Sequence, residues 1–139
     1  MTPAPTNPRV QAALDRTRSA DWQERVDAVR ELVLFPARSD VHDRLVALLD
    51  DDTDLAVVVA AAEALLAQQD TGGVTRVLAI VLDGPDDAAF AISDRLLALL
   101  HDQPDLVGWL RGQGAAGALD AQVVSAVLES VGINSAPGA

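Results

Sequence analysis

The sequence lacks cysteine and lysine altogether, and only 3% of its 139 residues are aromatic. Without cysteine, both a disulfide framework and a thiolate metal site are excluded. With so few aromatic side chains, the core has to be built from alanine, valine and leucine in a chain that is 50% hydrophobic. Small aliphatic residues at helical spacing are typical of closely packed helices.

Long apolar segments are lacking as well. The longest apolar run, 55–67, is interrupted by Glu63 and is too short to span a bilayer. The first eight residues, MTPAPTNP, have neither the basic nor the apolar region of a signal peptide. The sequence therefore predicts a soluble, cytoplasmic protein.

Positive charge is scarce. The 21 acidic residues outnumber the ten basic residues, all of them arginines, and the net charge is −11. A surface of that sign repels phosphate backbones and anionic membranes. The charge thus argues against nucleic acid and membrane as partners, and it favours another protein, in particular a basic one.

An internal repeat runs through the chain. The segments VHDRLVALLDDDTD (41–54) and VTRVLAIVLDGPDD (74–87) align without gaps at an offset of 33 residues (74 − 41 = 33), so that Val41 matches Val74 and Leu45 matches Leu78. One step earlier, the same offset matches Asp21 with Asp54. Repeats of this length indicate stacked structural units. We predict three repeats, at 19–51, 52–84 and 85–117.

Within each repeat the apolar residues recur at helical spacing. The first helices are predicted at 21–35, 54–69 and 86–101, and the second helices at 40–49, 74–83 and 105–112. They are separated by helix breakers, namely Pro36, Gly72–Gly73, Gly84–Pro85 and Pro104. An additional helix, with Asn7 as its cap and Pro8 in its first turn, is predicted at 7–17, and another, capped by Asp120, within 118–132, before a tail at 133–139. All of residues 1–139 are predicted to form one all-α domain.

The repeats resemble the short HEAT-like repeats of phycobilisome-lyase-like proteins. In that family one repeat ends in a leucine-rich segment and an aspartate, and the next begins with an aspartate followed by spaced aliphatic residues. The segment LVALLDDDTDLAVVVAAAEAL (45–65) is similar to this pattern, whereas DDAAFAISDRLLALL (86–100) departs from it. The resemblance implies a short right-handed α-solenoid of about three two-helix repeats, with an extra helix at each end.

The aspartates at 50–54 have two interpretations. A calcium loop of the EF-hand type requires glycine at its sixth position and glutamate at its twelfth, but Leu55 and Ala61 stand there. Alternatively, Asp54 and its equivalents Asp21 and Asp87 each cap the start of a first helix. The second interpretation needs no ligand, and it leaves Asp51 and Asp52 as additional carboxylates in a solvated turn.

The resemblance also suggests a surface. The family has an arginine that pairs with turn aspartates of neighbouring repeats. Here that position holds Arg25 in the first repeat, but Val58 in the second and Ala91 in the third. We therefore expect an uncompensated acidic stripe, including Asp51 and Asp52, that is available to a basic partner.

The second helices suggest a further binding surface. In the 33-residue register Asp43, Arg76 and Trp109 share one position, and we expect His42, Asp43 and Val46 to point partly outward. Trp109 is either an exposed binding hot spot or a residue packed under the last helix. Helix 54–69 is apolar on nearly every side, so its last face is covered either by the chain's own core or by a second copy, through Val58 and Phe90.

No catalytic, cofactor or metal site is predicted. The DTGG segment at 70–73 echoes an aspartic protease motif but follows a predicted helix rather than a strand, and His42 and His101 lack metal-ligand spacing. We predict a non-enzymatic protein-interaction module, monomeric or homodimeric, without a cofactor. Two alternatives stay open, namely an immunity- or inhibitor-type protein that neutralises a basic toxin or nuclease, and an enzyme-associated, lyase-like subunit.

Overall fold

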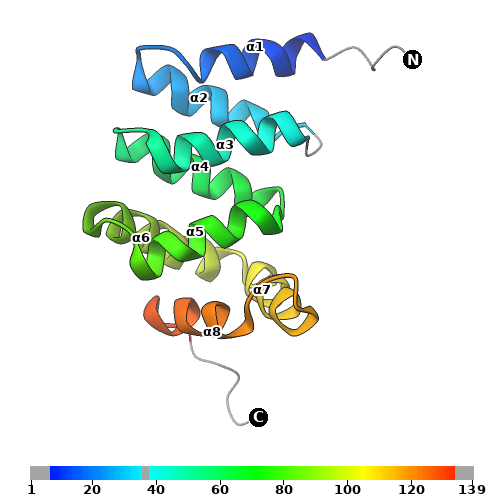
Figure 1. Ribbon diagram of the computed structural model, residues 1–139, viewed down its shortest axis with the longest axis vertical. Coiled ribbons are helices and arrows are strands. Elements are labelled where there is room, and N and C mark those ends of the chain that lie inside the picture. The colour runs from blue at the N-terminus through cyan, green and yellow to red at the C-terminus, as the bar shows by residue number, and fades with distance from the viewer. Residues whose placement is uncertain (1–6, 36–37, 134–139) are drawn as a thin grey trace. The chain divides into compact units, whose positions relative to one another are not determined.

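The computed structural model describes residues 7–35 and 38–133, and within them it contains eight α-helices and no strand. This confirms the prediction of an all-α fold. The helices, shown in Figure 1, are α1 (Pro8–Arg16), α2 (Trp22–Leu32), α3 (Ser39–Asp51), α4 (Leu55–Ala67), α5 (Thr71–Asp83), α6 (Asp86–Asp102), α7 (Pro104–Ala116) and α8 (Ala121–Ser130). None of these helices is both long enough and apolar enough to cross a membrane.

The chain divides into two compact units, Met1–Asp70 and Thr71–Ala139. In the first unit α1 packs against α2, while α2 and α3 both pack against α4. In the second unit α5 packs against α6 and α8, α6 contacts α7, and α7 packs against α8. Each unit thus contains helices that pack with neighbours close in the sequence and one pairing, α2 with α4 or α5 with α8, between helices farther apart.

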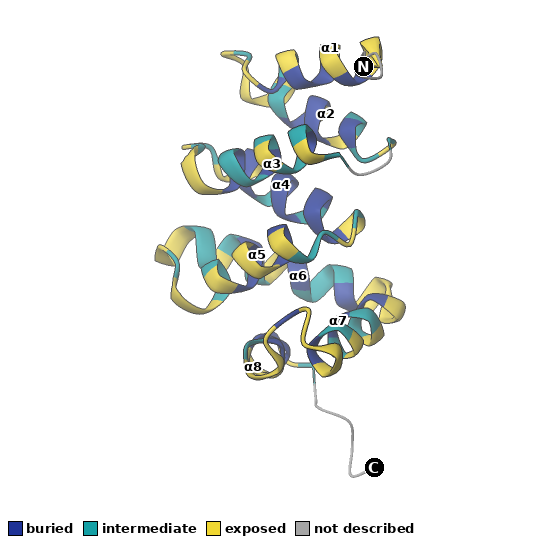
Figure 2. Cartoon of the chain, turned by 45° about the vertical axis from the view of Figure 1, so that its right-hand side comes forward, coloured by how far each residue is buried: buried dark blue, intermediate teal, exposed yellow. Residues whose placement is uncertain are grey.

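Helix α4 is the most thoroughly buried helix of the first unit, and in Figure 2 it is largely in the colour of buried residues. Eight of its thirteen residues are buried, all of them alanine, valine or leucine. This agrees with the expectation that nearly every face of this helix is covered. Val58 is among them, and its burial within the single chain makes it unavailable for the alternative contact with a second copy.

In the second unit the core is again aliphatic. Helix α6 contributes Ile92, Leu96 and Leu100, and α8 contributes Val124, Val127 and Leu128. Helices α7 and α8 approach each other closely at Gly114, where a Cβ atom would lie 3.3 Å from the Cα atom of Ala121. A glycine at this position therefore lets the two backbones come together.

At several positions from α2 to α5 the 33-residue register matches burial, although Leu82 is 38% exposed where its equivalent Leu49 is 3% exposed. Ala28 and Ala61 are both buried, as are Leu32 and Leu65, and Val41 and Val74. It fails in α6, where Phe90 is 75% exposed although its equivalent, Val57, is 0% exposed. Helix α6 begins 31 residues after α4 (86 − 55 = 31), and at that offset buried Ile92 and Leu96 correspond to buried Ala61 and Leu65.

The shift has a local cause. Three residues, 52–54, connect α3 to α4, whereas two, Gly84 and Pro85, connect α5 to α6, and α5 also ends one position earlier than the register requires. Helix α6 therefore begins two positions early. At about 100° per residue, two positions rotate a helix by roughly 200°, which turns the expected inner face outward.

Most of the predicted helix ends are confirmed. The side chains of Asn7, Asp21, Asp54 and Asp120 each accept a hydrogen bond from a backbone N–H in the first turn of α1, α2, α4 and α8. The prediction for Asp87 is only partly right, because α6 begins at Asp86 and Pro85 occupies the cap position, although Asp87 Oδ1 does accept the N–H of Ala88 at 2.8 Å. Asp87 therefore lies inside the first turn rather than before it.

The prediction that Gly72–Gly73 separates two helices is wrong. Helix α5 begins at Thr71, so both glycines lie in its first turn rather than between two helices. The left-handed conformation that ends α4 is adopted by Gln69, with φ 52°, and the N–H of Asp70 then donates to the carbonyl of Leu65 at 3.1 Å. The predicted breaker Pro36 and the tail beyond Ile133 lie outside the described residues.

Candidate functional site

The polar contacts of the first unit centre on Arg25, one turn into α2. Its Nε donates to Asp52 Oδ2 at 3.1 Å and its Nη2 donates to Asp52 Oδ1 at 3.3 Å. Its Nη1 donates to the carbonyl of Ser19, in the connection between α1 and α2, at 2.8 Å. The two charged side chains are only 15% and 8% exposed, so this pair fixes α2 to the end of α3.

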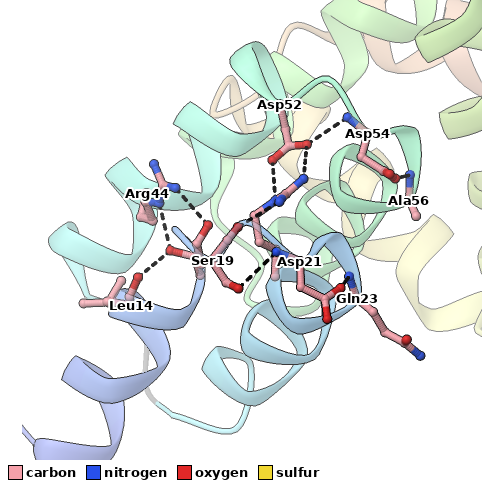
Figure 3. A network of polar contacts seen from close by, with 10 residues as sticks. Leu14, Ser19, Asp21, Gln23, Arg44, Asp52, Asp54 and Ala56 are labelled. Carbon is pink, nitrogen blue, oxygen red and sulfur yellow. Dashed lines mark hydrogen bonds and ion pairs between the residues drawn. The ribbon is translucent and has the colours of Figure 1, made fainter.

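Asp52 also organises the start of α4. Its Oδ1 accepts a hydrogen bond from the N–H of Asp54 at 2.9 Å, and Asp54 Oδ1 in turn accepts one from the N–H of Ala56 at 2.9 Å (Figure 3). The expectation that Asp52 lies in a solvated turn is therefore wrong. Asp52 directly follows α3 in an extended conformation, and its carboxylate is bonded inside the unit.

Asp51 differs from its neighbour. It is the last residue of α3 and is exposed. Among the described residues, no group of three or more histidine, aspartate or glutamate side chains is arranged to hold a metal ion. The carboxylate of Asp54 caps α4, as the capping interpretation expects, whereas that of Asp52 accepts bonds from Arg25 and from the N–H of Asp54.

A second arginine bridge joins α3 to α1, and sequence reasoning missed it. Thr17 is fully buried, and its Oγ1 donates to the carbonyl of Leu14 at 2.5 Å. Arg44 Nε donates to that same Oγ1 at 2.9 Å, and Arg44 Nη2 donates to the carbonyl of Thr17 at 3.0 Å. A guanidinium at a helix C-terminus satisfies carbonyls that have no partner within the helix.

The surroundings of this bridge shift the pKa of Arg44. Burial lowers the pKa of Arg44 from its ordinary value, and the positive charges of Arg18 and Arg25 lower it further. Asp52 and Asp51 act in the opposite direction. A threonine directly after a helix was the available sequence signal for this site, but it does not reveal which arginine would reach it.

The Nδ1 atom of His42 on α3 is in hydrogen-bond contact with the carboxylate of Asp70, the last residue of the first unit. The imidazole is about one third exposed, and the carboxylate is mostly buried. His42 was expected to point partly outward for a partner, but one of its ring nitrogens is bound within the unit. Asp70, the aspartate of the DTGG segment, thus serves to connect α3 with the end of α4.

At the start of α3 the charges of Arg38 and Asp40 are paired. The Nε of Arg38 donates to Asp40 Oδ1 at 3.0 Å, and this hydrogen bond is the main cause that lowers the pKa of Asp40 from its ordinary value. Asp40 Oδ1 also accepts a bond from the N–H of Val41. These contacts stabilise the first turn of α3, where Arg38 itself supplies no side-chain cap.

The remaining outer positions of the second helices are accessible to different degrees. On α3, Asp43 is exposed and Val46 is half-buried. In the second unit, Arg76 is exposed on α5 and Trp109 is half-buried on α7. Part of the Trp109 indole is therefore open to solvent, and part of it is packed.

A small pocket lies between α7 and α8. Its volume is about 170 Å³, and it is lined by Arg111, Gly114, Ala121, Val124, Ser125 and Leu128. Pockets for drug-sized ligands typically have volumes of about 300–1,000 Å³. The space therefore suits at most a small side chain or a few atoms.

Several large hydrophobic side chains are exposed, and sequence reasoning identified only one of them. Phe90 on α6 is 75% exposed and Trp22 at the start of α2 is 47% exposed. Phe90 was considered only as a contact between two copies.

No known family model matches the chain, and no characterised protein or solved structure matches it either.

Proposed function

We propose that this chain is a non-enzymatic protein-interaction module, a small acidic HEAT-like adaptor or regulator that binds a basic protein in the cytoplasm. The proposal includes a right-handed α-solenoid of about three two-helix repeats with an extra helix at each end. Its support is the 33-residue repeat, whose equivalent residues Ala28 and Ala61, or Val41 and Val74, are buried alike. Stacked repeats of this kind offer extended surfaces for binding.

The observation that carries the proposal is the exposure of large hydrophobic side chains on a strongly acidic chain. Trp22 and Phe90 are accessible to solvent. The net charge of −11 by itself favours solubility, so these aromatic side chains are exposed for a different reason. Exposed aromatic residues are enriched at the energetic centres of protein interfaces. Carboxylates around them favour a partner with arginine and lysine, because complementary charge accelerates association and selects the partner.

Among the residues expected to bind the partner, the accessible ones are retained. These are Asp43, Val46 and Asp51 in the first unit and Arg76 and Trp109 in the second. His42 contributes only its remaining exposed edge, because Asp70 holds Nδ1. Asp52 is excluded from the binding surface, because Arg25 and the backbone of Asp54 use its carboxylate.

The test is affinity capture from the native host with the tagged full chain. At about 50 mM salt we expect one or a few basic proteins to be retained, and at about 500 mM salt we expect most of them to be released, because salt screens exposed charges. The matched double variant Asp43→Asn with Asp51→Asn should retain less of these basic proteins than the wild type at low salt. Retention of acidic proteins only, or retention that salt does not change, would contradict the proposal.

The immunity- or inhibitor-type function is favoured by the charge of the second unit. It has only three arginines, Arg76, Arg95 and Arg111, against eight acidic residues. Such a surface can cover the basic substrate-binding face of a nuclease or toxin. The distinguishing measurement is the activity of the captured protein, which an inhibitor abolishes at a one-to-one ratio and an adaptor leaves unchanged.

A further inference from the structure

Phe90 lies on the side of α6 that faces away from the core. The core side chains of α6 are Ile92, Leu96 and Leu100, each at most 2% exposed. With about 100° per residue, Phe90 is rotated by roughly 160° from Ile92 around the helix axis. Its 75% exposure is therefore a result of the orientation of α6 and not of a frayed helix end.

The other accessible hydrophobic residues at helix starts differ in this respect. Trp22 precedes buried Val26 by four positions on α2, and Leu55 precedes buried Val58 by three positions on α4. Residues three or four apart share one side of a helix. Trp22 and Leu55 thus form the outer ends of core-facing stripes, whereas Phe90 extends no buried stripe.

Carboxylates surround Phe90 along the helix. Asp86 and Asp94 lie four positions before and after it, and Asp87 lies three positions before it. All three are exposed, and side chains at these spacings have Cβ atoms about 5–6 Å apart. Arg95 is rotated by roughly 140° from Phe90, and His101 lies about 16 Å farther along the axis. We name Asp86, Asp87, Phe90 and Asp94 the Phe90 face.

An aromatic ring between carboxylates matches the chemistry of an arginine or lysine side chain. The cation is attracted to the face of the ring, and the carboxylates accept its N–H groups. The chain itself contains a contact of the first kind, since Cζ of Arg9 lies 5.6 Å from the centroid of the Phe35 ring. On the Phe90 face the ring and the carboxylates are present, and the cation would come from outside.

We propose that the Phe90 face docks a segment of a partner protein that presents an arginine or lysine beside aliphatic residues. This inference rests on the proposed function and identifies the surface and the partner chemistry. A second copy of this chain is the less suitable occupant, because two such faces would bring six carboxylates together between molecules that each carry a net charge of −11.

The experiment uses the full chain, labelled with ¹⁵N, and a synthetic amphipathic peptide with arginine and leucine at helical spacing. A charge-reversed peptide with glutamate at each arginine is the negative control. We expect the basic peptide to shift amide resonances of α6 around Phe90 and the charge-reversed peptide to leave them unchanged. Affinity at several salt concentrations is measured by isothermal titration calorimetry.

Three variants locate the binding. Phe90→Ala is expected to lower the affinity for the basic peptide at least about tenfold, which is typical of an interface hot spot. The double variant Asp86→Asn with Asp94→Asn is expected to lower this affinity by a similar factor and to reduce the dependence of the affinity on salt concentration. The control is Asp15→Asn with Asp27→Asn, which removes the same charge from exposed positions of α1 and α2 and should change the affinity less than twofold.

The proposal for this face is overturned if Phe90→Ala binds like the wild type, if the control pair weakens binding as much as the α6 pair, or if no peptide shifts the α6 resonances. It is also overturned if sedimentation equilibrium shows a dimer that Phe90→Ala dissociates, because a second copy then occupies the face. Salt-sensitive capture of a basic protein by Phe90→Ala would retain the proposed function while rejecting this surface. Failure of capture by the wild type would reject the proposed function itself.

Discussion

Arg25 on α2 donates two hydrogen bonds to the carboxylate of Asp52, and the same carboxylate accepts the N–H of Asp54 before α4. One ion pair therefore connects the first turns of two neighbouring helices with the end of a third. Both partners are largely withdrawn from solvent, so their interaction is screened less by water than that of a surface pair. The pair belongs to the framework of the first unit.

Loss of this bridge should destabilise the protein. We expect Arg25→Ala to lower the free energy of unfolding by about 2 kcal/mol, because it leaves a mostly buried carboxylate without its charged partner. Urea denaturation followed by circular dichroism measures the change. Arg30→Ala, which removes an exposed arginine from the same helix, is the control and should cost no more than about 0.5 kcal/mol. Equal losses in both variants would show that the bridge contributes nothing specific.

The helix caps give a prediction that separates the sequence repeat from the structure. Asp21→Ala, Asp54→Ala and Asp120→Ala should each cost about 1 kcal/mol, because each carboxylate accepts a first-turn N–H. Asp87→Ala should cost less, about 0.5 kcal/mol, because Asp87 lies inside the first turn of α6 rather than at its cap, where its carboxylate interacts with the helix dipole and accepts the N–H of the adjacent Ala88 at 2.8 Å. Thermal unfolding of the four variants tests this, and a cost at Asp87 as large as at Asp54 would restore the 33-residue register.

Gln69 occupies a backbone conformation that favours glycine. Its φ of 52° lies in the left-handed region, which costs roughly 1 kcal/mol or more for a residue with a Cβ atom. Glycine also increases the entropy of the unfolded chain, which offsets part of the gain. We therefore expect Gln69→Gly to raise the free energy of unfolding by several tenths of a kcal/mol. Gln68→Gly, one position earlier and right-handed, should be destabilising under the same urea assay.

Two glycines of α7 should respond in different ways to alanine. Gly108 is exposed, and a Cβ atom there would meet nothing within 4 Å, so Gly108→Ala should stabilise the protein by about 1 kcal/mol through helix propensity. At Gly114 the new Cβ atom would lie 3.3 Å from Ala121 Cα, which requires α8 to move. We expect Gly114→Ala to lack this gain. A gain at Gly114 equal to that at Gly108, measured by thermal unfolding, would contradict the close packing of α7 and α8.

The predictions from sequence succeeded where the cause is local. Apolar spacing located the six helices of the three predicted repeats within a few residues, because one face of each helix has to be buried. Asn7-Pro8 and Asp120 indicated the first and the last helix. The caps at Asn7, Asp21, Asp54 and Asp120 were predicted because a capping side chain binds a backbone group two or three residues ahead. Asp87 does not occupy the cap position, because α6 begins earlier than the 33-residue register predicts and a cap depends on where its own helix begins.

For the candidate site, the sequence predicted the exposed residues but not the contacts between helices. The sequence indicated that Asp43 and Arg76 would be exposed, because they lie opposite apolar residues on their own helices. It gave no means to see that His42 would bind Asp70, or that Arg44 would reach Thr17, since these pairs are 28 and 27 residues apart. Such contacts depend on how one helix is placed on another.

The amino-acid sequence alone determined that this protein is helical, acidic and built around small aliphatic side chains, because composition and periodicity decide which surfaces avoid water. Only the tertiary structure decided which carboxylates remain available and that Phe90 is turned toward solvent. The reason is that a connection one residue shorter and a helix that ends one residue earlier leave every local pattern intact, yet rotate all of α6.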